Sequence, residues 1–406
     1  MAAFQRQVSR FGLPTISSTI SKSSAQLTDT KSKRVVLIGG TGRVGSSIAR
    51  SLAKTSPKLR LVLAGRNREK GEGLASEIGV GTTFQSVDID DFESITIALD
   101  GADLVIHSAG PFQSRKRCTV LEAAIEKKIS YIDICDDLSH ARLAKSFHDK
   151  AVEAGVSAIV MSGLCPGVSN IMAAELVRMA QENASKPEEL KFSYFIAGSG
   201  GAGPTVLATS LLLLNQNVSV YSQGKLLKLK PYTDETKVDF GDGVGKRSVF
   251  GINLPEVTTA HEILNIPNVT AKFGTAPFFW NWLLSQIAGM EFLEDYSKVE
   301  SFARLSDPAV RAIDVLVGGK VSMRVDLDCK DGTRSTGLYT HPDLSVCAGA
   351  ATAAFVVPIL QGKTLPGVWF PEEREGIPIE CREGLLEKAS TGTSRYAMIV
   401  SYYHLH

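Results

Sequence analysis

The stretch that decides the fold is Arg34-Val-Val-Leu-Ile-Gly-Gly-Thr-Gly-Arg-Val-Gly45. Its apolar residues 35–38 predict a buried strand, and residues 46–54 then follow at helical spacing. The glycines between them fit the spacing G-x-G-x-x-G, in the strand–turn–helix context that a dinucleotide-binding turn requires. Such glycines let the backbone approach a pyrophosphate closely, and the start of the helix attracts phosphate groups. The stretch therefore predicts a nucleotide-binding site.

Composition narrows the functional class. The chain has 406 residues, of which 44% are hydrophobic, with 44 basic and 43 acidic side chains. This length is sufficient for two domains, and the balanced charge argues against a nucleic-acid partner. Six cysteines are scattered without C-x-x-C or zinc-ligand spacing, so neither a metal site nor a disulfide framework is expected. No segment predicts a transmembrane helix, and the partner we expect is a small-molecule substrate.

Residues 1–30 form a leader of a different composition. They contain no acid before Asp29, several serines and threonines, and few basic residues. This pattern is typical of an organelle transit peptide, and the hydroxyl content favours the chloroplast over the mitochondrion. A disordered N-terminal tail is the alternative. In either case we expect the fold to begin near residue 31.

The alternation of apolar runs and helical patterns predicts the fold class. Between residues 33 and 161 the two kinds of segment alternate, which indicates right-handed βαβ units and an α/β, Rossmann-type parallel sheet. After residue 167 the alternating segments 218–229 and 324–340 are each interrupted by a glycine turn, which predicts hairpins. We therefore expect a Rossmann domain at 31–167, an inserted α+β substrate and dimerisation domain at 168–345, a returning segment with a helix at 346–390, and a divergent tail at 391–406.

The end of the second strand indicates the cofactor. It reads Leu61-Val-Leu-Ala-Gly-Arg66, with no acid before Glu69. An acid there would bind the ribose 2′-hydroxyl of NAD, whereas an arginine can pair with a 2′-phosphate. Arg66 therefore favours NADP(H), and its alternative is a solvated loop arginine. Asp88, just past the third strand, either contacts the adenine or caps the helix that starts near Phe92.

Two rigid turns are expected at the carboxyl edge of the sheet, where α/β sheets bind ligands. The fourth strand ends in Ser108-Ala-Gly-Pro111, beside the expected nicotinamide ribose, and the sixth ends in Gly163-Leu-Cys-Pro-Gly167. Asp136 and Asp137 close another strand, where each either touches substrate or caps the next helix. Cys165 is either a substrate contact or a small buried residue.

Other candidates have structural explanations. His107 is expected to be a satisfied core histidine, His341 a loop residue, and Arg115-Lys-Arg117 a solvated helix start. Tyr221 and Lys225 match the Tyr-x-x-x-Lys pair of short-chain dehydrogenases. The alternation around them and Gly224 predict strand and turn, so the two side chains would not share a helical face.

The uncharged segment 273–290 is rich in aromatic residues. Pro277 and several polar residues interrupt it, so a core helix or a subunit contact is expected. The alternative is peripheral membrane contact through Phe278, Phe279, Trp280 and Trp282.

Taken together, these motifs resemble the saccharopine dehydrogenase family, in its NADP-dependent, saccharopine-reductase-like branch and in a plastid-targeted plant-type form. The motifs that carry the resemblance are Val-Leu-Ile-Gly-Gly-Thr-Gly-Arg-Val-Gly45, Ala-Gly-Arg-Asn67, Ser-Ala-Gly-Pro-Phe112, Tyr-Ile-Asp-Ile-Cys-Asp-Asp137, Gly-Leu-Cys-Pro-Gly167 and the late Pro-Gly-Val-Trp-Phe-Pro-Glu-Glu373. The resemblance implies a Rossmann domain interrupted by a substrate domain, with a C-terminal helix returning to the first. It also implies hydride transfer between NADP(H) and a C–N bond of an amino-acid-derived imine, with the cofactor supplying the chemistry.

By position, the resemblance implies site residues of two kinds, and we expect a homodimer. Asp136 and Cys165 would face substrate as catalytic residues. The cofactor would be bound by Gly39, Gly40, Thr41, Gly42, Arg43, Val44, Gly45, Arg66, Asp88, Ser108, Ala109, Gly110 and Pro111. The chain departs from the family in lacking a convincing set of arginines for a dicarboxylate substrate.

Two alternatives remain open at this point. One is an NADP(H)-binding, membrane-associated scaffold or redox sensor with little catalysis, indicated by the aromatic segment and the missing arginines. The other is an atypical short-chain dehydrogenase relative, since the glycine turn suits that group too.

Overall fold

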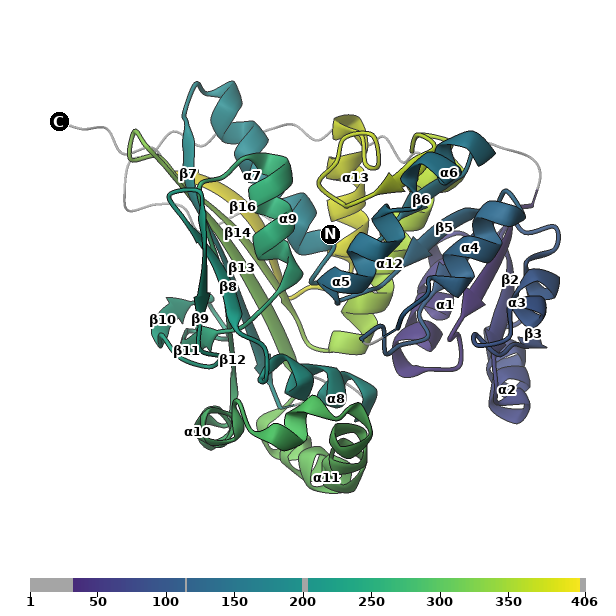
Figure 1. Cartoon of the computed structure of the whole chain (residues 1–406), viewed down its shortest axis with the longest axis horizontal. Coiled ribbons are helices and arrows are strands. Elements are labelled where there is room, and N and C mark those ends of the chain that lie inside the picture. Colours follow the sequence, from purple (N-terminus) through teal and green to yellow (C-terminus); the bar gives the residue numbers. More distant parts are fainter. Residues whose placement is uncertain (1–31, 114, 199–203, 402–406) are drawn as a thin grey trace, which may run out of the picture. The chain divides into compact units, whose positions relative to one another are not determined.

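The computed structural model describes residues 32–113, 115–198 and 204–401, except for the side chains of residues 204–206, 313, 314, 316 and 317. These residues build two sheets with covering helices (Figure 1). The α/β class, the Rossmann-type sheet and the second α+β part are thereby confirmed. The domain boundaries expected from the sequence stay a prediction.

The first sheet has seven parallel strands within the described residues, in the order β15-β6-β5-β4-β1-β2-β3. Because the chain leaves β1 for β2 on one side and places β4 on the other, the order reverses between β1 and β4. That reversal is the point where sheets of this kind bind ligands. The strands are β1 (Arg34–Ile38), β2 (Arg60–Gly65), β3 (Thr82–Ser86), β4 (Leu104–His107), β5 (Ser130–Asp133), β6 (Ser157–Ile159) and β15 (Gly367–Trp369).

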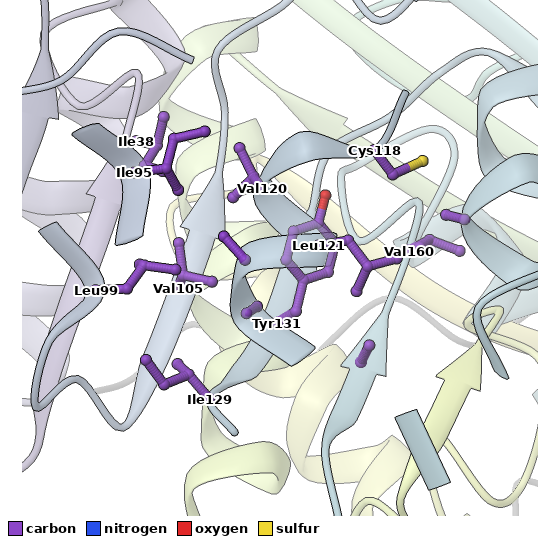
Figure 2. Packing of buried hydrophobic residues seen from close by; sticks show 14 of the residues in the cluster. Ile38, Ile95, Leu99, Val105, Cys118, Val120, Leu121, Ile129, Tyr131 and Val160 are labelled. Carbon is purple, nitrogen blue, oxygen red and sulfur yellow. The ribbon is translucent and has the colours of Figure 1, made fainter. Parts of the chain in front are cut away.

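Helices connect these strands, and their apolar faces form the core of the first sheet. Figure 2 shows side chains of β1, β4 and β5 packed against α3 and α4, with Val105, Leu99 and Leu121 fully buried. Each such side chain contributes roughly 1.5–3 kcal/mol by leaving water. The helices are α1 (Arg43–Thr55), α2 (Arg68–Ile78), α3 (Phe92–Leu99), α4 (Thr119–Glu126), α5 (Leu138–Lys145) and α6 (His148–Ala154).

The helical pattern at residues 141–154 predicts one helix, but the structure has two, α5 and α6. The backbone N–H of Phe147 donates to the carbonyl of Ala144, three residues back, and so tightens the turn between them. A new helical register then begins when the N–H of Ala151 donates to Phe147.

The second sheet is mixed, in the order β10-β11-β12-β7-β13-β14-β16, with β8 joined to β12 and β9 joined to β8. Strands β7 and β12 run parallel, and the other neighbours pair antiparallel. Both predicted hairpins are confirmed, as β8–β9 and β13–β14. The strands are β7 (Pro187–Ala197), β8 (Val218–Ser222), β9 (Lys225–Leu229), β10 (Thr236–Asp239), β11 (Lys246–Gly251), β12 (Asn268–Ala276), β13 (Lys320–Cys329), β14 (Arg334–His341) and β16 (Arg395–Ser401).

Helices of this second part contribute to the site or brace it. The long helix α7 contacts β13 and β14, while α8 packs against α11 and α10 lies beside β12. The elements are α7 (Val168–Glu182), α8 (Pro204–Leu213), α9 (Pro255–Leu264), α10 (Phe278–Ile287), the 3₁₀ turn η1 (Glu291–Glu294) and α11 (Tyr296–Val317).

The C-terminal part returns to the first sheet, as the resemblance implied. Helix α12 (Leu344–Leu360) packs so closely on α1 that a Cβ on Gly349 would lie 2.6 Å from the carbonyl carbon of Ser47. Strand β15 pairs with β6, and helix α13 (Ile379–Ala389) follows. Within the segment expected to be a divergent tail, β16 extends the second sheet along β14.

Candidate active site

The glycine turn after β1 lies at the reversal point of the sheet. A Cβ on Gly45 would lie 2.1 Å from the carbonyl oxygen of Gly39, so helix and turn meet backbone to backbone. Gly39 itself has a φ of +82°, a conformation that favours glycine, and a Cβ there would lie 2.6 Å from the amide nitrogen of Ala109. Helix α1 has no side-chain cap at its N-cap residue Gly42, which leaves its first turn suited to an anion. The turn therefore fits a pyrophosphate.

The turn after β4 contacts the glycine turn directly. Because Gly39 packs against Ser108 and Ala109, the structure brings together two predicted cofactor segments that are 70 residues apart. The Ser108 hydroxyl donates to the carbonyl oxygen of Ile38 at 2.8 Å, so this donor holds β4 against β1.

Three neighbouring residues at the end of β2 make different contacts. Asn67 caps α2 by accepting from the N–H of Lys70 at 2.9 Å, and Arg68 pairs with Glu72 at 3.1 Å. Arg66 is exposed and forms no ion pair with the residues that the structure describes. A Cβ on the preceding Gly65 would lie 3.2 Å from the Thr41 hydroxyl, so Arg66 follows directly beside the glycine turn. This placement fits a ribose 2′-phosphate.

The interpretation of Asp88 as a helix cap is wrong. Asp91 caps α3, because its Oδ1 accepts from the N–H groups of Glu93 at 3.0 Å and Ser94 at 3.2 Å. The Asp88 carboxylate instead accepts from the N–H of Asp90 at 3.0 Å in the preceding turn. Its contact with the adenine stays a prediction.

Asp136 and Asp137 also have different contacts in the structure. The Asp137 carboxylate caps α5 by accepting from the N–H of His140 at 2.7 Å. Asp136 lines a cavity instead, and its Oδ1 accepts from the side-chain amide of Gln113 at 2.9 Å. Burial raises the pKa of Asp136 to about 6, so this carboxyl group can gain or lose a proton near neutral pH.

The cavity that Asp136 lines has a volume of about 380 Å³. From the first sheet it is lined by Val44 of the glycine turn, by Asp136 and by the turn at residues 163–166. Tyr194 and Thr275 line it from the second sheet, and helices α8, α10, α11 and α12 complete it. The cavity therefore joins the expected cofactor turn to both predicted catalytic residues, Asp136 and Cys165.

Cys165 lies in this cavity as a neutral thiol. Burial raises its pKa well above the usual value for cysteine, and the carboxyl group of Glu256 raises it further. A thiolate nucleophile is therefore not favoured, and Cys165 can act as a substrate contact or as a weak hydrogen-bond donor.

Asp133 supports the site, and no sequence pattern indicated this role. Its buried carboxylate accepts from the N–H groups of Cys135 at 3.0 Å and Met161 at 2.8 Å, and from the Tyr131 hydroxyl at 3.0 Å. These bonds fix the turns that carry Asp136 and Cys165. His107 lies in the core beside Tyr131 as expected, with its pKa lowered to about 3 by burial. Its Nε2 has no partner among the described residues, so this histidine is buried but only partly satisfied.

Tyr194 and Glu256 form a second buried pair at the cavity wall, which sequence reasoning missed. The Tyr194 hydroxyl donates to Glu256 Oε1 at 2.7 Å, and Ser169 donates to the same oxygen at 3.3 Å. Burial raises the pKa of Glu256 to about 7. Because the two partners lie 62 residues apart and belong to β7 and α9, no local pattern marks them.

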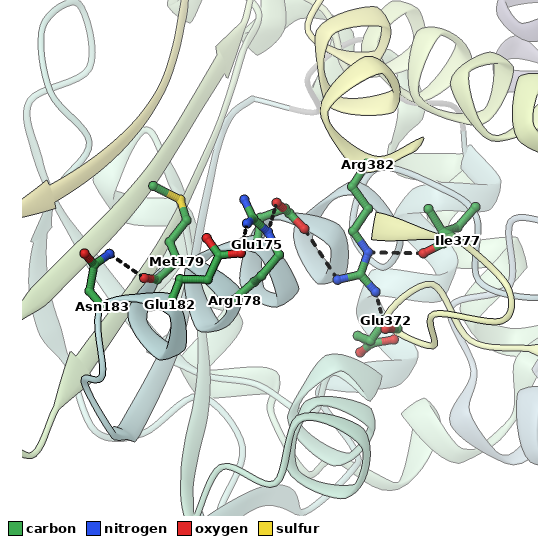
Figure 3. Close-up of polar contacts among 8 residues, drawn as sticks. All are labelled: Glu175, Arg178, Met179, Glu182, Asn183, Glu372, Ile377 and Arg382. Carbon is green, nitrogen blue, oxygen red and sulfur yellow. Dashed lines mark hydrogen bonds and ion pairs between the residues drawn. The ribbon is translucent and has the colours of Figure 1, made fainter. Parts of the chain in front are cut away.

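A buried polar cluster fixes the C-terminal segment against α7 (Figure 3). Arg382 is only 3% exposed, and its guanidinium donates to the carbonyl oxygens of Ile377 at 3.2 Å and Glu372 at 2.7 Å. It also lies 3.5 Å from Glu175, which Arg178 contacts at 2.8 Å. The cluster holds the segment after β15 in place, and its groups lie outside the cavity lining.

Four other residues considered in the sequence lie outside the cavity lining: Tyr221, Lys225, His341 and Arg115. Tyr221 and Lys225 lie on the separate strands β8 and β9, which confirms that they are not a helical catalytic pair. The expectation that His341 is a loop residue is wrong, since it ends β14 and is only 3% exposed. Its Nδ1 accepts from the N–H of Asp343. Arg115 pairs with Asp90 at 3.0 Å, and α4 begins only at Thr119, so residues 115–117 precede the helix and do not start it.

The expectation of a core helix within residues 273–290 is wrong. Helix α10 has no buried residue, and Phe278 and Trp282 are 84% and 65% exposed. Trp280, on the other side of the helix, lines the cavity. Among the described residues, none of the helices has the length and apolarity to cross a membrane, and no group of three or more potential metal ligands occurs.

Comparison with known proteins supports the resemblance to the saccharopine dehydrogenase family. Residues 35–159 match the family described as the saccharopine dehydrogenase NADP binding domain. This match covers the part of the chain that forms strands β1 to β6 of the first sheet. Its fold is similar to that of the apo saccharopine dehydrogenase (L-Glu forming) from Saccharomyces cerevisiae, with a TM-score of 0.67 and 16% identity over 91% of this chain and 100% of that one. The match to an NADP binding domain confirms NADP(H) as the cofactor, which is the preference that Arg66 indicates.

Two curated relatives add detail. The chain is 24% identical to carboxynorspermidine synthase from Vibrio cholerae over 348 residues, covering 76% of this chain and 81% of that protein. It is 30% identical to carboxyaminopropylagmatine dehydrogenase from Synechocystis sp. over 149 residues, which is 34% of this chain and only 36% of that relative. These findings favour an oxidoreductase over the scaffold and short-chain dehydrogenase alternatives.

Proposed function

We propose that this protein transfers hydride between NADP(H) and the C–N bond of an imine, forming or consuming an amine. The observation that carries the proposal is the single cavity that joins the glycine turn, through Val44, to Asp136 and Cys165. The names of the two curated relatives support an amine product, since they refer to agmatine and norspermidine derivatives.

In this proposal, three segments of the chain bind the cofactor. The backbone of the glycine turn, from Gly40 to Val44, holds the pyrophosphate at the start of α1. Arg66 pairs with the 2′-phosphate, and the turn at residues 108–111 lies beside the nicotinamide. When bound, the cofactor supplies the hydride.

Asp136 handles the proton that the reaction requires. Adding hydride to the imine carbon leaves the nitrogen in need of one proton, and a carboxyl group with a pKa near 6 can supply it at neutral pH. The hydrogen bond from Gln113 fixes the orientation of this carboxyl group. Cys165, as a neutral thiol, contacts the substrate near the same atoms.

The experiment follows the consumption of NADPH with paired amines and carbonyl compounds, including amino acid and keto acid pairs. Asp136→Asn should lower kcat by roughly 10²–10⁴-fold with little change in the Kd for NADPH. Asp137→Asn is the matched control, because asparagine caps a helix as well as aspartate does. Tight NADPH binding without turnover of any imine would overturn the proposal.

Three partner and location predictions from the sequence remain proposals: a homodimer, a chloroplast location and peripheral membrane contact near Phe278 to Trp282. The exposure of Phe278 and Trp282 is the surface that an interfacial contact requires. Sedimentation with liposomes tests it, and Trp282→Glu should abolish the sedimentation if this helix makes the contact.

A further inference from the structure

The composition of the cavity wall indicates the class of substrate. Away from the turns of the first sheet, its lining consists largely of aliphatic and aromatic side chains of β12 and the helices. Examples are Leu207, Leu211 and Leu214 near α8, Phe273 of β12, and Trp280 and Leu284 of α10. A volume of about 380 Å³ is sufficient for a small-molecule ligand.

Charge in the cavity argues against a dicarboxylate. Among the described residues that line it there is no lysine or arginine, and Asp136 is the acidic member. A carboxylate taken out of water needs a cation or several N–H donors, and here it would meet a group of its own sign. Arg115 pairs with Asp90 at 3.0 Å and Arg304 of α11 pairs with Glu300 at 2.7 Å, and neither arginine lines the cavity.

Three polar side chains that line the cavity donate hydrogen bonds to other groups of the protein and not toward the cavity. The Tyr194 hydroxyl donates to Glu256 at 2.7 Å, Tyr232 donates to Asn281 at 2.7 Å, and Thr275 donates to the carbonyl oxygen of Ile196 at 2.8 Å. Thr352 differs, because its buried Oγ1 has no hydrogen-bond partner among the described residues. The wall therefore offers a ligand apolar surface with very few polar groups.

We propose that the substrate is an imine whose body is an uncharged hydrocarbon chain or ring, held in this apolar cavity with its C–N bond beside Asp136. This inference rests on the proposed function, and it departs from the amino-acid-derived imine implied by the family resemblance. Each additional methylene group buried in the cavity should tighten binding about fourfold until the cavity is full.

The experiment uses the full chain saturated with NADPH and a series of unbranched aldehydes from butanal to decanal, each with methylamine. The KM for the aldehyde should fall about fourfold per added methylene until the cavity is filled. The Kd values of the corresponding N-methylalkylamines, measured by calorimetry with NADP⁺ present, should fall in parallel. A glutamate and 2-oxoglutarate pair serves as the dicarboxylate comparison.

Variants of one helix provide the matched control. Leu284→Arg places a cation in the lining of α10 and should raise the alkyl KM at least tenfold. Trp282→Arg, on the exposed side of the same helix, should leave it unchanged. If Leu284→Arg fails to fold, Leu284→Ala should still weaken amine binding by removing apolar contact.

The outcomes separate the two proposals. Faster turnover of the dicarboxylate pair than of any alkyl pair would overturn the apolar substrate and leave imine reduction standing. KM and Kd values that do not change with chain length would overturn it as well. Amines that bind with the expected chain-length dependence, with no oxidation of NADPH by any imine, would uphold the apolar cavity and overturn the proposed function.

Discussion

Replacing Gly45 by alanine tests the glycine turn most sharply. The added methyl group would lie 2.1 Å from the carbonyl oxygen of Gly39 and 2.9 Å from the Cα of Gly40, whereas ordinary contacts begin near 3.4 Å. The three nearest atoms all belong to the backbone of Gly39 and Gly40, so no side chain can rotate away. The turn or the first turn of α1 must therefore move by more than 1 Å.

Such a displacement removes backbone amides from the pyrophosphate. A hydrogen bond to a charged group contributes about 1.5–3 kcal/mol, so the loss of one or more should raise the Kd for NADPH by at least about tenfold. Calorimetric titration measures that Kd, and a thermal unfolding scan shows whether the variant folds.

Gly73→Ala is the control for this variant. Gly73 also lies in a helix, α2, but a Cβ there would have no atom within 4 Å. Its replacement should leave the Kd for NADPH unchanged and should stabilise the helix by up to about 1 kcal/mol. Wild-type NADPH affinity in Gly45→Ala would refute the cofactor assignment of this turn.

Three further variants test the site and its support. Arg66→Asp should raise the Kd for NADPH at least about tenfold and leave that for NADH nearly unchanged, since it removes a charge-assisted pairing; equal effects on both would argue against the 2′-phosphate contact. Burial raises the pKa of Glu256 from 4.5 to about 7, so the folded state loses stability as pH rises through that range. Glu256→Gln should remove this loss and stabilise the protein at pH 8 by roughly 3 kcal/mol, measured by denaturant unfolding at pH 5 and 8; a variant with wild-type pH dependence would contradict it. Arg382→Met removes one of the two arginines beside Glu175 and leaves two buried carbonyl groups without their donor, which should cost about 1–3 kcal/mol for each carbonyl and lower the Tm, while exposed Arg374→Met should not change the Tm.

The Rossmann-type part was predictable because its signals are local. A strand, a glycine turn and a helix occupy adjacent positions, so the spacing of a few residues determines both the turn and the anion site. The basic residue at the end of β2 indicated the cofactor for the same reason. Helix caps were harder: the sequence indicated Asp88 as a possible cap of α3, whereas the backbone geometry makes Asp91 the cap.

The substrate side was far less predictable. The pairs Gln113–Asp136 and Tyr194–Glu256 join residues 23 and 62 positions apart, on elements whose packing no periodicity specifies. The composition of the cavity depends on how α8, α10 and α11 meet β12. For α10, an uncharged aromatic segment predicts burial, yet hydrophobicity alone cannot show that only one side of the helix has a neighbour to pack against.

In the proposed reaction, hydride passes from NADPH to the carbon of an apolar imine in this cavity. The most direct measurement uses NADPH deuterated at C4, in its two epimers, with octanal and methylamine, followed by mass spectrometry of the amine. The structure predicts one deuterium on the carbon of the new C–N bond, from one epimer only. Deuterium found only in octanol, or in no product while NADPH remains bound, would contradict the claim.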